Sequence, residues 1–122
     1  MTRAEAAAYK RALQYRAFMG LNDWAIRITF ERDEEQNLGT CKPSPQYKEA
    51  DLNFDLDLHV LPDRELDETL RHELAHMILA PLGSMAAKLC QDDKVLRGLW
   101  EDAEDLVATH IARMSVWDSL NE

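Results

Sequence analysis

The chain contains little of what marks several classes of protein. Four glycines and four prolines in 122 residues are too few for a collagen-like chain, and 46% hydrophobic residues are too many for a disordered one. No apolar run approaches the ~20 residues that a membrane-spanning helix needs. The first residues also lack the apolar stretch of a signal peptide. We therefore expect one globular domain over residues 1–122, without a membrane partner.

Cysteine is also scarce, since only Cys41 and Cys90 are present and they lie far apart. Their separation matches no zinc-ligand or redox motif. Two reduced thiols in a reducing compartment are the simpler interpretation, which predicts a cytoplasmic protein. A single structural disulfide is the alternative.

Basic residues are outnumbered, with 14 Lys and Arg against 23 Asp and Glu and a formal net charge of −9. Proteins that bind nucleic acid in general neutralise phosphates with Lys and Arg, so we expect no nucleic-acid partner. An anionic membrane surface is disfavoured for the same reason. The acidic excess lies entirely after residue 32, because residues 1–32 hold six basic and three acidic residues.

The first half of the chain predicts a helix followed by strands. Thr2 and Glu5 form a capping box, and Gly20 is placed to end the helix. Its apolar face is expected to consist of Ala6, Tyr9, Leu13 and Ala17. Residues 24–30 alternate between apolar and polar side chains, as a half-buried strand does.

A second strand pattern covers residues 52–58, where four apolar residues alternate with Asp and Asn. The acidic face of this strand is expected to be solvated. Residues 38–41 are a candidate for a further short strand. The Pro43-Ser44-Pro45 segment predicts a loop after it.

The second half of the chain predicts two helices. Pro62 and Asp63 open the first, which we expect to run to about Leu79 and to be closed by Pro81 and Gly83. The apolar stripe of the last helix comprises Val95, Leu96, Leu99, Trp100, Ala103, Leu106, Val107, His110, Ile111 and Met114. These elements predict an α+β fold with an N-terminal helix, a small sheet of three or four mostly antiparallel strands, and two further helices.

One motif in the first of these two helices carries chemistry. His72 and His76 are four residues apart, so both imidazoles project from the same helix face and can reach one Zn²⁺. Glu73 follows the first histidine and can accept a proton from a water molecule that the metal activates. H-E-x-x-H is therefore expected to mark a zinc site with a general base.

Residues 69–82 resemble the active-site helix of zincin metallopeptidases. Uncharged residues surround the H-E-x-x-H motif and a hydrophobic residue, Ile78, closes it. The layout is similar to the minimal zincin domains of the ImmA/IrrE and SprT-like groups, and most similar to short metallopeptidase-like proteins of phages and prophages. The resemblance implies a zinc-dependent peptidase of narrow specificity in the cytoplasm of a bacterial cell or a phage-infected host.

A zincin needs a third protein ligand, which the glutamate-ligand branch takes from a later helix. Glu101 and Glu104 are the candidates. Glu101 with Asp105 has the E-x-x-x-D spacing of the thermolysin-like branch, in which the Asp supports a ligand histidine. Glu104 lies closer in helical angle to the apolar stripe, which should face the neighbouring helix. We therefore predict His72, His76 and Glu104 as metal ligands, with Glu101 as the alternative.

The remaining roles are less determined by the sequence. His59 and His110 are outside candidates for ligands, and His110 is expected in the core. The resemblance implies a substrate-binding edge strand, for which we expect residues 52–58. Tyr47, Arg71 and His110 are candidates for stabilising the oxyanion, and the choice stays open.

The resulting hypothesis is peptide-bond hydrolysis by a metal-activated water, with Glu73 as general base and a protein or peptide as substrate. The alternative is a catalytically weak protein of zincin fold that binds or cleaves one specific partner. A chain of this length supplies only a shallow cleft, so a protein partner that completes it belongs to either reading.

Overall fold

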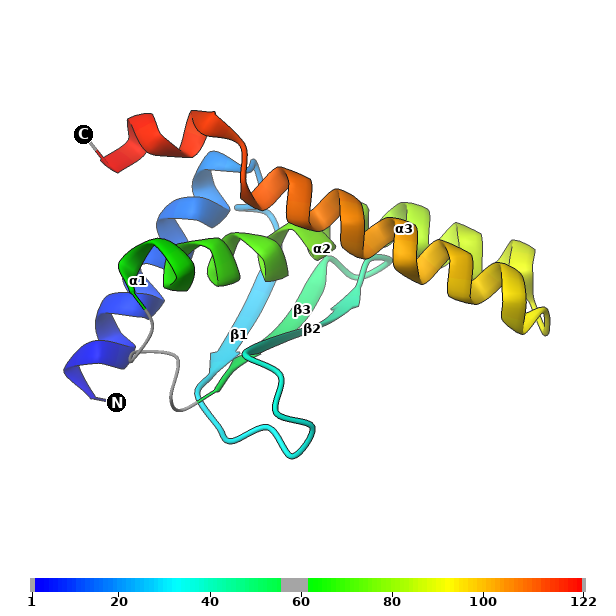
Figure 1. The fold of residues 1–122 in the computed structure, drawn as a ribbon, viewed down its shortest axis with the longest axis horizontal. Coiled ribbons are helices and arrows are strands. Elements are labelled where there is room, and N and C mark those ends of the chain that lie inside the picture. The colour runs from blue at the N-terminus through cyan, green and yellow to red at the C-terminus, as the bar shows by residue number, and fades with distance from the viewer. Residues whose placement is uncertain (1, 56–61, 122) are drawn as a thin grey trace.

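A computed structural model describes residues 2–55 and 62–121, the last three by their backbone alone. Its elements follow one another as a helix, three strands, two long helices and a short 3₁₀ helix (Figure 1). The α+β fold expected from the sequence is therefore confirmed. Residues 56–61, which include the end of the predicted strand at 52–58 and His59, lie outside the described residues. None of the helices in the described ranges is both long enough and apolar enough to cross a bilayer.

Helix α1 spans Arg3–Phe18 and begins as predicted. The Thr2 hydroxyl accepts a hydrogen bond from the Glu5 backbone N–H, and the Glu5 carboxylate accepts one from the Thr2 N–H, both at 3.1 Å. Its buried residues are Ala8, Ala12 and Tyr15, so the predicted apolar face was wrong. Apolar side chains occur on several faces of this alanine-rich helix, and packing against α2 selects one of them.

The sheet has the strand order β1-β3-β2, with β1 at Ala25–Thr29, β2 at Gly39–Ser44 and β3 at Glu49–Phe54. It is mixed rather than mostly antiparallel, because β3 pairs parallel to β1 and antiparallel to β2. Strand β2 continues through Pro43, where we had expected a loop. Proline lacks a backbone N–H. An edge strand tolerates it because one side of the strand pairs with no neighbour, so the missing donor costs no ladder hydrogen bond.

Helix α2 spans Asp63–Cys90 and helix α3 spans Lys94–Ala112. The predicted end of α2 near Leu79 was wrong, since the helix continues through Pro81 and Gly83. Helix α3 runs back alongside α2 and packs against it (Figure 1). This packing outweighs the local cost of a proline within the helix.

The core lies between the sheet and α2. Its largest fully buried side chains are Leu52, Phe54, Leu70, Leu74 and Met77. At the other end of α2, Trp117 of the 3₁₀ helix (Ser115–Asn121) packs edge-on against the ring of Tyr15 at 5.8 Å between centroids. The C-terminal segment thereby covers the contact between α1 and α2.

Arg71 of α2 is buried between α1, the end of α3 and the 3₁₀ helix, and it contacts all three. Its Nε donates to the backbone carbonyl of Ala112 at 2.9 Å, and its Nη1 donates to the Tyr15 hydroxyl at 3.2 Å. The guanidinium also lies over the rings of Tyr15 and Trp117. Arg71 therefore joins α1, α3 and the C-terminal segment to α2.

The apolar stripe predicted for the core side of α3 is largely exposed. Ala108 and Ala112 are the buried residues of this helix, whereas Leu99 and Leu106 are 60% and 70% exposed. His110 is exposed too, which corrects its expected place in the core. Small side chains face α2 because they let the two helix backbones approach closely.

Replacing Arg71 with alanine should lower the free energy of unfolding by about 2–4 kcal/mol, because it removes two buried hydrogen bonds and leaves Tyr15 and Ala112 without their donor. Urea denaturation followed by circular dichroism measures the effect. Arg27→Ala is the matched control, since the Arg27 side chain is 75% exposed, and it should change stability by less than ~0.5 kcal/mol. Equal effects of the two substitutions would contradict the joining role of Arg71.

Candidate metal centre

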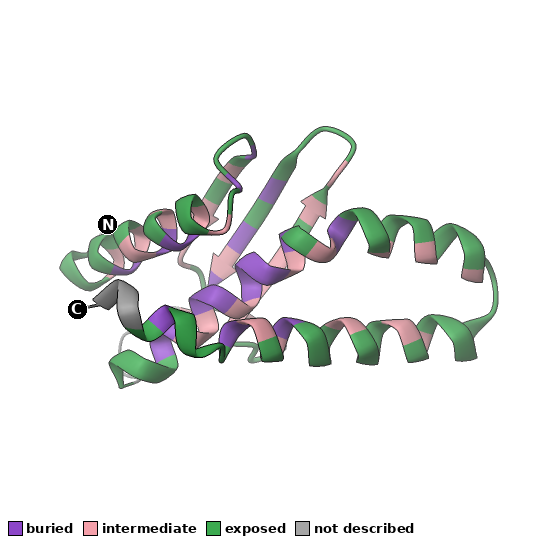
Figure 2. Ribbon diagram, turned by 90° about the horizontal axis from the view of Figure 1, so that it is seen from above, coloured by how far each residue is buried: buried purple, intermediate pink, exposed green. Residues whose placement is uncertain are grey.

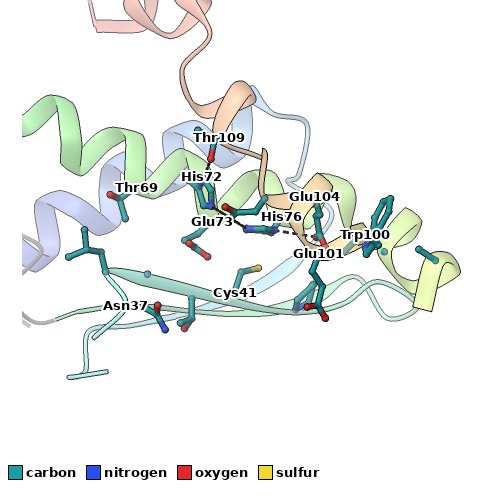
Figure 3. A pocket seen from close by; sticks show the side chains of 18 of the residues that line it. Asn37, Cys41, Thr69, His72, Glu73, His76, Trp100, Glu101, Glu104 and Thr109 are labelled. Carbon is teal, nitrogen blue, oxygen red and sulfur yellow. Dashed lines mark hydrogen bonds and ion pairs between the residues drawn. The ribbon is translucent and has the colours of Figure 1, made fainter. Parts of the chain in front are cut away.

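A groove of about 1250 Å³ runs between strand β2 on one side and helices α2 and α3 on the other. His72, Glu73 and His76 from α2 and Glu101, Glu104 and Thr109 from α3 line it above β2 (Figure 3). Helix α2 places the two histidines one turn apart on the face that looks into the groove. The groove therefore gathers the residues that the motif singled out.

The two imidazoles meet at a distance that suits one metal ion. Their Nε2 atoms are 3.3 Å apart, and the rings meet edge to face. Two ligands of a tetrahedral zinc ion, each at ~2.0–2.1 Å from it, lie roughly 3.3–3.4 Å apart. His72, Glu73 and His76 each offer a ligand atom, and these atoms lie within 4.8 Å of one another. The helix thus presents a His-Glu-His group that could bind a metal ion.

Helix α3 holds both rings from their opposite sides. His72 Nδ1 lies 3.3 Å from the Thr109 hydroxyl, and His76 Nδ1 lies 3.2 Å from the Glu104 carboxylate (Figure 3). Metal-binding histidines usually donate their other ring N–H to such a partner, which fixes the tautomer and the ring orientation. Both Nε2 atoms are therefore left to face a common point.

A carboxylate of α3, that of Asp105, also lies close to that point. One of its oxygens lies 3.0 Å from His72 Nε2 and 3.8 Å from His76 Nε2. Glu104, our predicted third ligand, contacts His76 at Nδ1 instead, and the exposed Glu101 lines the groove. Glu104 as the third ligand stays a prediction, and the structure adds Asp105 to the candidates.

Sequence reasoning treated Asp105 only as a support for a ligand histidine. The E-x-x-x-D spacing was a signal for Asp105. The prediction of Glu104 instead assumed that the apolar stripe of α3 faces α2, and most of that stripe is exposed. Glu104 does face α2, although for a different reason. It lies one turn before Ala108, whose buried side chain marks the side of α3 that packs on α2.

Glu73 is buried at the floor of the site. Burial raises its pKa to about 7, with His76 lowering it and Asp105 raising it. Gly39 of β2 makes room for this side chain, because a Cβ there would lie 2.8 Å from Glu73 Cγ and 3.2 Å from the Phe54 ring. A carboxylate with a pKa near neutrality can both accept and release a proton.

The pKa of His72 is lowered, chiefly by burial and secondly by His76. A lowered pKa favours the neutral imidazole, which is the form that binds a metal. Cys41 also lines the groove, and burial raises the pKa of its thiol to about 12, with help from Glu73 and Glu104. Cys41 and Cys90 are both free thiols in the structure.

Several weaker predictions about the site are corrected. The substrate strand expected at 52–58 overlaps the end of β3, which is the central strand, and β2 is the edge strand beside the groove. Of the candidates for the oxyanion, Arg71 is engaged in the core, and neither Tyr47 nor His110 lines the groove. The strand order could not be inferred because it depends on pairing between distant segments.

No family model, no curated protein and no solved structure matches the chain. The assignment of the site therefore depends on its own geometry and chemistry.

In the metal-free protein, Glu73 should make stability fall as the pH rises. Its pKa is about 7 in the folded state and near 4.5 when solvated, so the folded state keeps a proton that the unfolded chain has released. The stabilisation from this retained proton is fully present below pH 4.5 and is lost as the pH rises through 7. The free energy of unfolding should fall by about 3 kcal/mol over that range.

Urea unfolding in EDTA at pH 5 and pH 8 measures this contribution when the wild-type chain is compared with Glu73→Gln. The loss of stability between the two pH values should be smaller in the variant by about 2–3 kcal/mol. Identical losses in both proteins would show that Glu73 is not the group responsible.

Proposed function

We propose that this chain is a zinc-dependent metallopeptidase whose metal is held by His72 and His76. The observation that carries the proposal is the 3.3 Å separation of their Nε2 atoms, next to a buried glutamate and on the wall of an open groove. Thr109 and Glu104 already occupy the two Nδ1 atoms, so the ligand geometry exists before any metal binds.

For the third ligand we favour Asp105, with Glu104 as the residue that orients His76. This assignment is supported by the atoms that each carboxylate contacts, since Asp105 lies at the Nε2 side of both rings and Glu104 at the Nδ1 side of one. Glu104 and Glu101, the candidates from the sequence, remain the alternatives. Two imidazoles and one carboxylate form a donor set that zinc accepts, with one position left open for chemistry.

A bound zinc ion supplies Lewis-acid polarisation of the substrate carbonyl and makes water more acidic. Glu73 accepts the proton of the attacking water and donates it to the leaving amine. Its raised pKa suits both steps, because the group is poised between its two protonation states near neutral pH. A histidine binds a metal through its neutral ring, which is the form that the lowered pKa of His72 favours.

An extended peptide is the substrate that the groove fits best. Strand β2 borders the groove and is an edge strand, so part of its main chain is free to pair with an added strand. Such pairing would hold a peptide bond across the site while side chains contact α2 and α3. This arrangement supports a peptide or an unfolded segment of a protein as substrate.

A second candidate is a regulatory protein that binds one partner and hydrolyses it weakly or not at all. The exposure of the Asp105 side chain, at 65%, favours this candidate, because an exposed carboxylate is not held in one geometry for catalysis until a partner covers it. A partner that covers the groove would complete the site in either case.

Metal binding tests the ligand assignment. Isothermal titration of EDTA-treated protein with ZnCl₂ should give one equivalent for the wild type. His72→Ala and Asp105→Asn should each weaken binding by more than about 100-fold, and Glu104→Gln by about 10–100-fold, as expected for a residue that orients a ligand. Glu101→Gln should bind like the wild type. A large loss in Glu101→Gln with none in Asp105→Asn would instead support the thermolysin-like arrangement.

Hydrolysis of casein and of a fluorogenic peptide library tests the reaction. Glu73→Gln should keep one equivalent of zinc and the wild-type fold, and should lose at least about 100-fold in rate because the general base is gone. Glu34→Gln, an exposed control of the same chemistry, should be fully active. A zinc-loaded wild type without activity in both assays would favour the regulatory candidate.

A further inference from the structure

The outer part of the α2–α3 pair lacks a core of its own. None of the described residues from 81 to 107 is buried. Figure 2 shows both helices exposed along most of this length, where they extend beyond the sheet. Yet the segment contains eight large apolar side chains that are exposed: Leu82, Met85, Leu89, Val95, Leu96, Leu99, Leu106 and Val107. Helices in proteins owe most of their stability to the packing of an apolar face against another element. We therefore expect another molecule to cover the apolar side chains of this segment.

Seven apolar residues form one surface, which we call the hairpin face. Ile78, Leu82, Met85 and Leu89 of α2 follow one another at intervals of four, three and four residues, the spacing of a helix-packing seam. At about 100° per residue, the centre of this stripe lies well over 90° around α2 from the groove residues His76, Gly83 and Ala87. The antiparallel helix α3 adds Leu96, Ala103 and Val107.

The size of the hairpin face matches that of a stable interface. From the exposed fractions of its side chains, it presents roughly 700 Å², close to the ~800 Å² that each partner buries in a standard complex. The largest apolar patch on a typical monomer is ~300–600 Å² and often functional. An exposed area at or above that range is expected to be covered.

We infer that a second copy of this chain covers the hairpin face, with the two hairpins packed antiparallel as a four-helix bundle. Two-fold symmetry pairs equal faces, so each apolar stripe meets a stripe of the same length.

This dimer leaves the metal centre accessible. His72 of α2 and Glu101 and Asp105 of α3 line the groove on the sides that face away from the hairpin face. Ala86 and Trp100 also line the groove, and they lie beside the hairpin face. Self-association therefore stabilises the projecting helices on the side away from the histidines, and it does not depend on the proposed peptidase activity.

Sedimentation equilibrium of the full chain tests the dimer. The wild type should have twice the monomer mass of 14.0 kDa at micromolar concentration. Leu82→Glu combined with Leu89→Glu should raise the dissociation constant by more than about 100-fold. Tyr47→Glu is the matched control, because Tyr47 is 70% exposed in the turn after β2, and it should remain dimeric. A monomeric wild type at all concentrations, which would leave this face to solvent or to another protein, would overturn the inference.

Disulfide trapping tests the geometry without relying on destabilising changes. Met85 lies at the middle of its stripe, so an antiparallel pair places it next to its own copy. Met85→Cys, in a background of Cys41→Ser and Cys90→Ser, should form a disulfide-linked dimer under mild oxidation. Tyr47→Cys in the same background should not. Equal cross-linking of both variants, or none in Met85→Cys, would contradict the antiparallel dimer.

Discussion

The close approach of helices α2 and α3 is the constraint on which the rest of the structure depends. Two alanines, Ala108 and Ala112, are completely buried on the side of α3 that packs against α2. Arg71 then holds the end of α3 through the carbonyl of Ala112. Because the two backbones lie this close, the short side chains of Thr109 and Asp105 reach histidines on the neighbouring helix. A wider spacing would leave the imidazoles without partners.

The site lies at the boundary between the packed and the unpacked parts of the molecule. On one side, Glu73 is buried beside Gly39 of β2, and its carboxylate loses hydration. On the other side, the groove opens along helices that have no core. This position explains how one turn of α2 can carry a desolvated proton acceptor beside histidines that remain reachable from solvent. The same lack of core beyond the site leaves the hairpin face uncovered.

Several structural features followed from local sequence patterns, and others contradicted them. The capping box at Thr2 predicted the start of α1, since its hydrogen bonds form within one turn. Pro81 and Gly83 predicted the end of α2 wrongly, because contacts with α3 outweigh the local preference of two residues. Likewise, Pro43 predicted a loop but lies in β2, at an edge where a missing N–H costs little. The predicted end of α2 and the loop at Pro43 failed where contacts with distant segments decided the conformation.

The sequence by itself determined the α+β class, the beginnings of α1 and α2 and the pairing of His72 with His76, because each depends on residues within a few positions of one another. Tertiary structure alone decided which carboxylate of α3 meets which ring nitrogen. Side chains one residue apart, such as Glu104 and Asp105, differ by about 100° around a helix. Their roles therefore depend on the rotation of α3 about its own axis relative to α2. The buried alanines set this rotation, whereas the apolar stripe from which we predicted it is mostly exposed.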